Sequence, residues 1–337
     1  MIGHASRGKS SLVLAFVLRR VLQSAFVLAL VAFIAFGLFN FTGDPVTFMA
    51  GQEATAADKA RLRADLGLDR PFYVQFGAFV ANALHGDFGL SLRQGRQVAT
   101  LLKERLPATL ELAATAAALA LIVGIPLGVY TALRRDGALA HFLLAASLIG
   151  VSLPTFLIGI LLILVFAVQL GWLPSFGRGE TTALGWWTTG LLTPGGLKAL
   201  VLPAITLSLF PMTLVMRLVR AEMLEVLRTD YIKFARARGL PERVIHFGHA
   251  LRNTLVPVIT ITGLQLGTII AFAIITETVF QWPGMGLLFI QAVNFSDVPV
   301  MAAYLCFIAL VFVAINLTVD LLYYAVDPRL HVERVAH

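Results

Sequence analysis

Six long stretches without Asp, Glu, Lys or Arg dominate this chain of 337 residues. A helix needs about 20 mostly apolar residues to cross a bilayer, and each stretch is close to that length or longer. Charged residues make up 13% of the chain, against about 25% in soluble domains. The sequence therefore predicts an all-α membrane protein with a single transmembrane domain over residues 1–337. The uncharged stretches are 21–43, 112–133, 137–177, 199–216, 253–276 and 298–319.

The third stretch is long enough for two helices, so the distribution of positive charge has to decide the number of spans. Lys and Arg crowd the region between the fourth and fifth stretches. Splitting the third stretch would put five crossings before that region instead of four and place it outside, against the rule that short basic loops stay in the cytoplasm. We therefore expect one third span, kinked at Pro154, with both termini in the cytoplasm. The expected spans are about 14–40, 107–133, 138–168, 199–220, 253–280 and 298–324.

Several other classes of function are excluded by local context. Residues 3–10, "GHASRGKS", fit the phosphate-binding P-loop pattern, but no strand precedes them and a membrane span follows. A P-loop requires a strand leading into a helix. The net charge of +7 indicates cytoplasmic loops rather than nucleic-acid binding. His246 and His249 are three residues apart, and two histidines without a third ligand do not predict a metal site. No metal site and no catalytic residues are expected.

The first loop outside the membrane, residues 44–104, is too long to be a simple connection. Its segment "TAADKARLRADLGLDRP" predicts a surface helix that Thr55 caps, that Gly67 ends and that Pro71 follows. The loop either covers the outer mouth of the domain or meets a partner, or it packs as a lid that has no partner. We expect it in the periplasm.

The cytoplasmic loop 221–252 holds a second predicted helix, "TDYIKFARARGLP". Thr229 or Asp230 can cap its start, Gly239 permits a left-handed end, and Pro241 prevents continuation. We expect one face of this helix to present Tyr231, Phe234 and Ala235. A short helix with an aromatic face suits a partner's groove. The basic residues around this face are Lys233, Arg236 and Arg238.

Motifs spread over nearly the whole chain point to one family. The segment "DYIKFARARGL…HALRNTLVPVIT" resembles the EAA loop of permease subunits of ATP-binding-cassette importers, in the dipeptide and oligopeptide branch. Lys233 and Phe234 stand where Glu and Ala are usual, and Arg252 stands where Pro is common, which is the form of the loop in that branch. The other matching motifs are "GDPV" (43–46), "LGLDRP" (66–71), "HGDFGLSL" (85–92), "LPATLELA" (106–113), "GIPLGV" (124–129), "LPAITLSL" (202–209), "MLEVLRTDYI" (223–232), "TETVFQWPGMG" (276–286) and "NLTVDLLYYAVDPR" (316–329).

The resemblance implies a type I ABC importer permease in the bacterial inner membrane. It implies a second homologous permease, two ATP-binding subunits that hold ATP and Mg²⁺, and a periplasmic binding protein. This chain would bind no cofactor, and would pass peptides by alternating access. Dipeptides, oligopeptides, glutathione and nickel complexes all remain open as cargo. The residues expected to couple the permease to the ATPase are Thr229, Asp230, Tyr231, Phe234, Ala235, Arg236, Ala237 and Gly239.

Four polar residues in the predicted spans are candidates for the pathway or gate: Gln265, Glu277, Asn316 and Asp320. Each has a structural alternative, since buried polar groups in membranes also hold helices together. Glu277 could be a hydrogen-bonded residue at the outer turn of its helix, and Asp320 could pair with Arg217 or Arg220. Two rival functions remain open at this point: an ion-coupled secondary transporter that uses Glu277 and Asp320, and a membrane scaffold that transports nothing.

Overall fold

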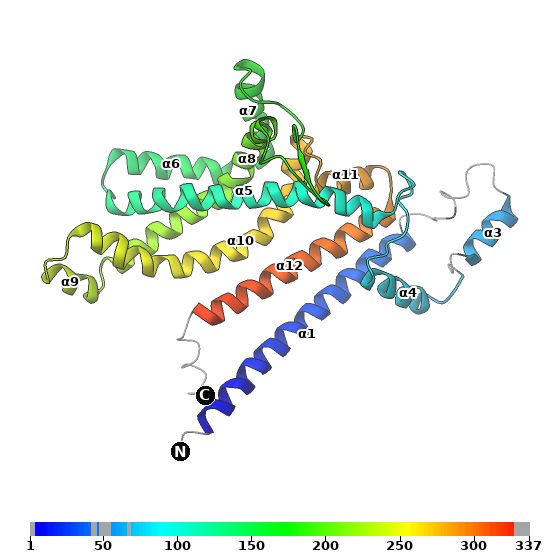
Figure 1. Cartoon of the computed structure of the whole chain (residues 1–337), viewed down its shortest axis with the longest axis horizontal. Coiled ribbons are helices and arrows are strands. Elements are labelled where there is room, and N and C mark those ends of the chain that lie inside the picture. The colour runs from blue at the N-terminus through cyan, green and yellow to red at the C-terminus, as the bar shows by residue number, and fades with distance from the viewer. Residues whose placement is uncertain (1–3, 42–45, 47–54, 66–68, 327–337) are drawn as a thin grey trace. The chain divides into compact units, whose positions relative to one another are not determined.

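The computed structural model describes residues 4–41, 46, 55–65 and 69–326, and within them the chain is almost entirely helical (Figure 1). One short antiparallel hairpin, in which Ala183 pairs with Thr188, interrupts the helices. The elements are α1 (His4–Phe41), α3 (Ala56–Asp65), α4 (Phe72–Leu84), α5 (Val98–Leu133), α6 (Ala138–Ser152), α7 (Thr155–Leu162), the π-helix η1 (Ile163–Gln169), β1 (Thr182–Leu184), β2 (Trp187–Thr189), α8 (Pro194–Val226), α9 (Asp230–Ala237), the π-helix η2 (Val244–Ala250), α10 (Leu251–Val279), α11 (Met285–Asn294) and α12 (Val298–Val326).

Five of the described helices are long and apolar enough to cross a bilayer, and a bent helix pair makes a sixth crossing if it counts as one span. This agrees with the six predicted spans. The bent pair is α6 followed by α7 and η1, and its break lies at the predicted kink at Pro154. The helix direction bends by 109° at this break. Pro154 caps α7 at the break, and it lacks the N–H that would continue the hydrogen-bond ladder of α6.

The chain forms two compact units. The first contains residues 1–104 and 288–317, and the second contains 105–287 and 318–337. In the first unit, α4 packs against α1 through aromatic side chains, with the rings of Phe36 and Phe72 5.0 Å apart. Asp297, just before α12, is buried and accepts hydrogen bonds from the Ser91 hydroxyl and the backbone N–H of Leu92.

The first loop contains more helix than the sequence predicted. The predicted surface helix is α3, and Thr55 caps it as expected, because its hydroxyl accepts the Asp58 N–H at 3.2 Å. The Asp58 carboxylate in turn accepts the Thr55 hydroxyl at 2.6 Å and the Thr55 N–H, and these bonds lower the pKa of this carboxyl. Gly67 lies outside the described residues. The sequence reading missed α4, and the second span begins earlier than expected, at Val98.

The second unit is built around close contacts of α5 with α8. Each glycine of the "GIPLGV" motif faces a valine of α8: a Cβ on Gly124 would lie 3.0 Å from the Val215 side chain, and one on Gly128 would lie 2.6 Å from that of Val219. Small residues of this kind let membrane helices approach closely. Alanines of α5 and α8 then pack with α10 in a buried cluster that includes Trp282.

Candidate functional site

Helix α9 is the short surface helix that the sequence predicted between the fourth and fifth spans. It runs from Asp230 to Ala237, and Gly239 follows with a left-handed φ of 75°. Thr229 occupies the capping position but does not cap with its side chain. Its hydroxyl donates to the Val226 carbonyl at 2.6 Å, so the predicted capping bond is not formed.

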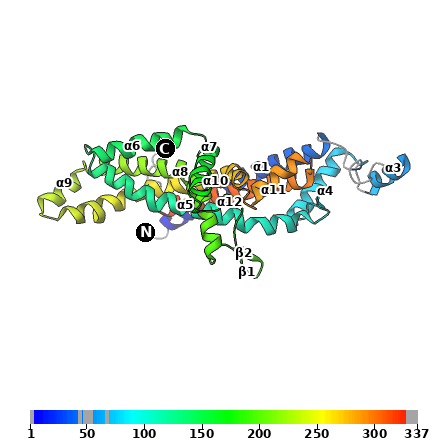
Figure 2. The ribbon, with the colours of Figure 1, turned by 90° about the horizontal axis from the view of Figure 1, so that it is seen from above.

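One side of α9 is anchored in the second unit. Ile232 is fully buried and Ala235 is 8% exposed. Both pack in an apolar cluster with the C-terminal ends of α5 and α8, near the turn from α5 to α6 (Figures 1 and 2). The expectation that Ala235 belongs to the exposed face is therefore wrong, because its small side chain lets the helix sit closely on this cluster.

The opposite side of α9 is exposed and aromatic. Tyr231 is 43% exposed and Phe234 is 64% exposed. The next turns add further exposed apolar side chains at Leu240, Val244 and Phe247. We call these five residues the aromatic ridge. Large exposed apolar groups next to charged ones are typical of a protein–protein interface.

Ion pairs surround the aromatic ridge. Lys233 contacts Asp230 at 2.8 Å, and this hydrogen bond lowers the pKa of the Asp230 carboxyl. Arg236 contacts Glu242 at 2.9 Å and likewise lowers the pKa of Glu242, which also lies 3.0 Å from His246. Both carboxylates are therefore charged at neutral pH, and these pairs would weaken only as the pH falls through the lowered pKa values.

A side-chain contact connects α9 to a membrane span. Asn253, at the start of α10, donates to the Tyr231 hydroxyl at 2.5 Å. The π-helix η2 also packs between the two elements through Ile245, which is buried in the same cluster as Ile232. These two contacts connect α9 to the start of α10.

Glu277, a predicted gate candidate, is fully buried, and its carboxylate accepts hydrogen bonds from neighbouring groups. The Thr109 hydroxyl donates to it at 2.6 Å, and the Leu287 N–H donates at 3.0 Å. Thr109 also accepts the Met285 N–H at 2.8 Å. Glu277 thus ties the "TETVFQWPGMG" turn and the start of α11 to α5, which matches the structural alternative for this residue.

We expect Gly284→Ala to lower the free energy of unfolding by about 1–3 kcal/mol, the usual cost of overpacking. A Cβ at Gly284 would clash with the Glu277 carboxylate. Thermal unfolding of the purified chain in detergent measures the loss. Gly77→Ala is the matched control, because Gly77 is exposed in α4 and a Cβ added there would meet no atom within 4 Å. Equal melting temperatures for the two variants would contradict this role for Glu277.

The sequence reading missed the partner of Glu111. The structure pairs this buried carboxylate with the buried guanidinium of Arg178, and the Gly190 N–H also donates to it at 3.1 Å. Arg178 donates further to Thr188, at 2.9 Å to the hydroxyl and 2.7 Å to the carbonyl. The pair holds the β1–β2 hairpin to α5. The sequence did contain a sign of this pair: Glu111 is a lone carboxylate within an apolar helix, and such a carboxylate requires a partner.

The other pathway candidates lie on two helices. Gln265 is half-buried on α10, and Asn316 is half-buried on α12. Asp320 belongs to α12, but its side chain lies outside the described residues, so its pairing with Arg217 or Arg220 stays a prediction. Among the described residues, no group of three or more His, Cys, Asp or Glu could hold a metal ion.

The P-loop-like segment lies in a helix. From His4 onward its backbone is part of α1, so within the described part the N–H groups of Gly8 and Lys9 are in helical geometry rather than in an open loop.

Comparisons with known proteins cover almost the whole chain. Residues 124–332 match the model of the binding-protein-dependent transport system inner membrane component, and residues 13–113 match the model of the N-terminal part of such membrane components. The dipeptide transport system permease protein DppB of Alkalihalophilus pseudofirmus is 37% identical, over 94% of this chain and 99% of that protein. The probable D,D-dipeptide transport system permease protein DdpB of Escherichia coli is 41% identical, over 86% of this chain and 88% of that protein.

A solved structure shares the fold. The inward-facing MetNI methionine ABC transporter contains a chain that superposes with a TM-score of 0.54 at 20% identity, over 67% of this chain and 96% of that chain. At this identity the likeness shows the fold alone, which is that of a type I ABC importer permease. With the five or six candidate spans of the described residues and the family match, it follows that the chain belongs to the family of binding-protein-dependent transport system inner membrane components and is a multi-pass ABC transporter permease subunit, not a catalytic one.

Proposed function

We propose that this permease moves di- or oligopeptides across the bacterial inner membrane in an importer driven by partner ATPase subunits. The observation that carries the proposal is α9, which is anchored by Ile232 and Ala235 and presents Tyr231 and Phe234 to a partner. The peptide cargo rests on the names of the two relatives, which are dipeptide and D,D-dipeptide permeases.

The proposed assembly has a second homologous permease, two ATP-binding subunits and a periplasmic substrate-binding protein. ATP and Mg²⁺ would bind only to the ATP-binding subunits, and this chain would hold no cofactor. Both termini and the loop 221–252 would face the cytoplasm, and residues 44–104 would face the periplasm. The excess of Lys and Arg around α9 supports this orientation.

Transport would proceed by alternating access. Closure of the ATP-binding subunits would move α9, and the Tyr231–Asn253 contact and η2 would carry that movement into α10. Each partner can shift the balance of inward-open and outward-open states only by its different affinity for the two. The proposed coupling set is Thr229, Asp230, Tyr231, Phe234, Ala235, Arg236, Ala237 and Gly239, with Ala235 acting as the anchor rather than as a contact.

The assembled complex in proteoliposomes tests this function. We expect dipeptide uptake that requires ATP and the binding protein, that vanadate blocks, and that a protonophore leaves unchanged. Uptake by this chain without ATP-binding subunits, driven by an ion gradient, would overturn the proposal. We expect no dependence on an ion gradient because the Glu277 carboxylate already accepts hydrogen bonds from Thr109 and Leu287.

A further inference from the structure

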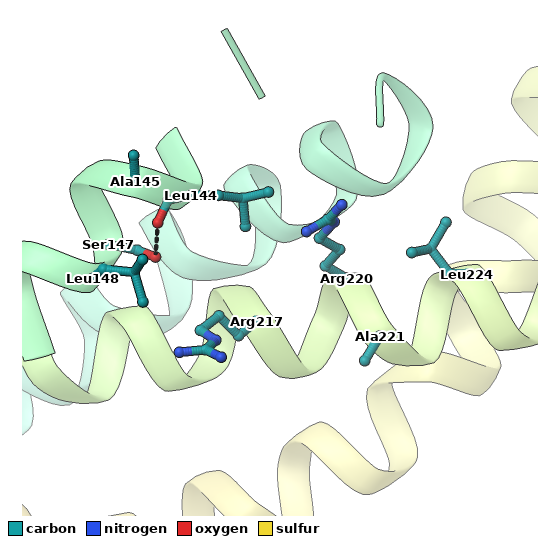
Figure 3. A pocket seen from close by; sticks show the side chains of 8 residues that line it. All are labelled: Leu144, Ala145, Ser147, Leu148, Arg217, Arg220, Ala221 and Leu224. Atoms are coloured by element: carbon teal, nitrogen blue, oxygen red, sulfur yellow. Dashed lines mark hydrogen bonds between the residues drawn. The ribbon is translucent and has the colours of Figure 1, made fainter. Parts of the chain in front are cut away.

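An open groove of about 610 Å³ lies between α6 and α8 in the second unit (Figure 3). Leu144, Ala145 and Leu148 line it from α6. The Ser147 hydroxyl is bonded to the Leu144 carbonyl of its own helix at 2.7 Å, which leaves this wall apolar in character. The α8 wall differs, because it carries Arg217 and Arg220 one helical turn apart.

The two arginines line the groove without a described acidic partner. Among residues whose side chains are described, neither forms an ion pair, and the Nε atom of Arg220 is buried without a hydrogen-bond partner. A buried unpaired donor of this kind is costly unless a ligand or water satisfies it. Residues three apart lie on the same face of a helix, so both guanidinium groups can bind one anion.

The arginines stand at the level of lipid headgroups. The uncharged stretch of α8 covers residues 199–216, which corresponds to about 27 Å of helix, close to the thickness of a bilayer's hydrocarbon core. Arg217 is the first charge beyond that stretch. The groove therefore places the apolar wall of α6 opposite two cations of α8 at this level (Figure 3).

We propose that this groove binds an anionic phospholipid, with its phosphate between Arg217 and Arg220 and an acyl chain along Leu144 and Leu148. Guanidinium groups pair with phosphate oxygens in a fixed fork geometry. The neighbouring surface of α6 supports a lipid occupant over a peptide or a second permease. It exposes Leu139, Phe142 and Leu148, as a lipid-facing helix does, whereas a peptide pathway requires polar walls.

Native mass spectrometry of the full chain, delipidated in detergent, tests the proposal. The probes are phosphatidylglycerol and phosphatidylcholine with identical acyl chains. Because each basic residue near a headgroup contributes about one kcal/mol, we expect phosphatidylglycerol to bind the wild type on the order of 30-fold more tightly. Arg217→Gln combined with Arg220→Gln should abolish that preference. The control, Arg134→Gln with Arg135→Gln, changes two exposed cations of the α5–α6 turn that do not line the groove and should retain it.

A steric variant covers the case in which the double arginine variant fails to fold. Ala145→Trp fills the groove from α6 and keeps both charges, so it should also weaken phosphatidylglycerol binding. The proposal is overturned if the wild type shows no headgroup preference, if the preference survives both groove variants, or if cross-links from the groove capture only the peptide or the second permease. The binding measurement uses neither ATP nor peptide, so its failure leaves the proposed transport function standing.

Discussion

Phe234→Glu is expected to abolish ATP-driven uptake while the permease still inserts in the membrane. Phe234 is 64% exposed, so a glutamate there costs the fold little. In the proposed interface the same change would place an unpaired carboxylate in an apolar groove. Aromatic residues at such positions are often hot spots worth 2 kcal/mol or more, so binding of the ATP-binding subunit should weaken on the order of 30-fold.

Two measurements read out this variant: dipeptide uptake in proteoliposomes and co-purification of the ATP-binding subunits. Phe234→Tyr should retain both uptake and co-purification, because it keeps the aromatic ring. Asp136→Ala is the surface control, since Asp136 is exposed in the α5–α6 turn, and it should transport normally. Full uptake by Phe234→Glu would show that the aromatic ridge is not needed for coupling to the ATP-binding subunits. Ala235→Glu is a poorer test, because Ala235 is buried and the change would disrupt α9 itself.

Glu111→Ala is expected to produce the largest loss of stability in the chain, about 3–5 kcal/mol. It strands the buried Arg178 guanidinium, which then has no counter-charge among its described contacts. Chemical or thermal unfolding in detergent measures the loss. The double variant Glu111→Leu with Arg178→Met should be more stable than Glu111→Ala, because it removes both charges together.

An exposed ion pair gives the control for this prediction. Arg96 and Glu104 form a hydrogen-bonded pair at 2.5 Å with both side chains about half exposed, and this bond raises the pKa of Arg96. Solvent already stabilises both charges there, so Glu104→Ala should change the unfolding midpoint much less. Equal losses for Glu104→Ala and Glu111→Ala would show that the buried pair has no special structural role.

The six spans and the limits of α9 were predictable because each depends on local sequence. Long stretches without charged residues indicate membrane spans. Gly239 and Pro241 end α9 through their own backbone preferences, independently of tertiary contacts. The side of α9 that is buried was not predictable in this way. Tyr231 and Phe234 are the larger apolar residues, yet Ile232 and Ala235 fit the cluster of α5 and α8, and only the tertiary packing decides between the two faces.

The buried carboxylates show the second limit. Glu277 bonds to Thr109 across 168 positions, and Glu111 pairs with Arg178 across 67. No periodicity or spacing connects residues so far apart, so the sequence could identify the charges as unusual but could not name their partners. The sharp bend of α6 against α7 has the same origin, because Pro154 permits a break while neighbouring helices set its angle.

A cross-link from α9 in the intact complex tests the central claim most directly. In a Cys306→Ser background, which removes the chain's one cysteine, Phe234→Cys would carry a short photo-activated cross-linker. We predict a product that joins this permease to an ATP-binding subunit, and labelling of the cysteine from the cytoplasmic side before assembly. Labelling from the periplasmic side, or cross-links to lipid alone in the assembled complex, would contradict the account.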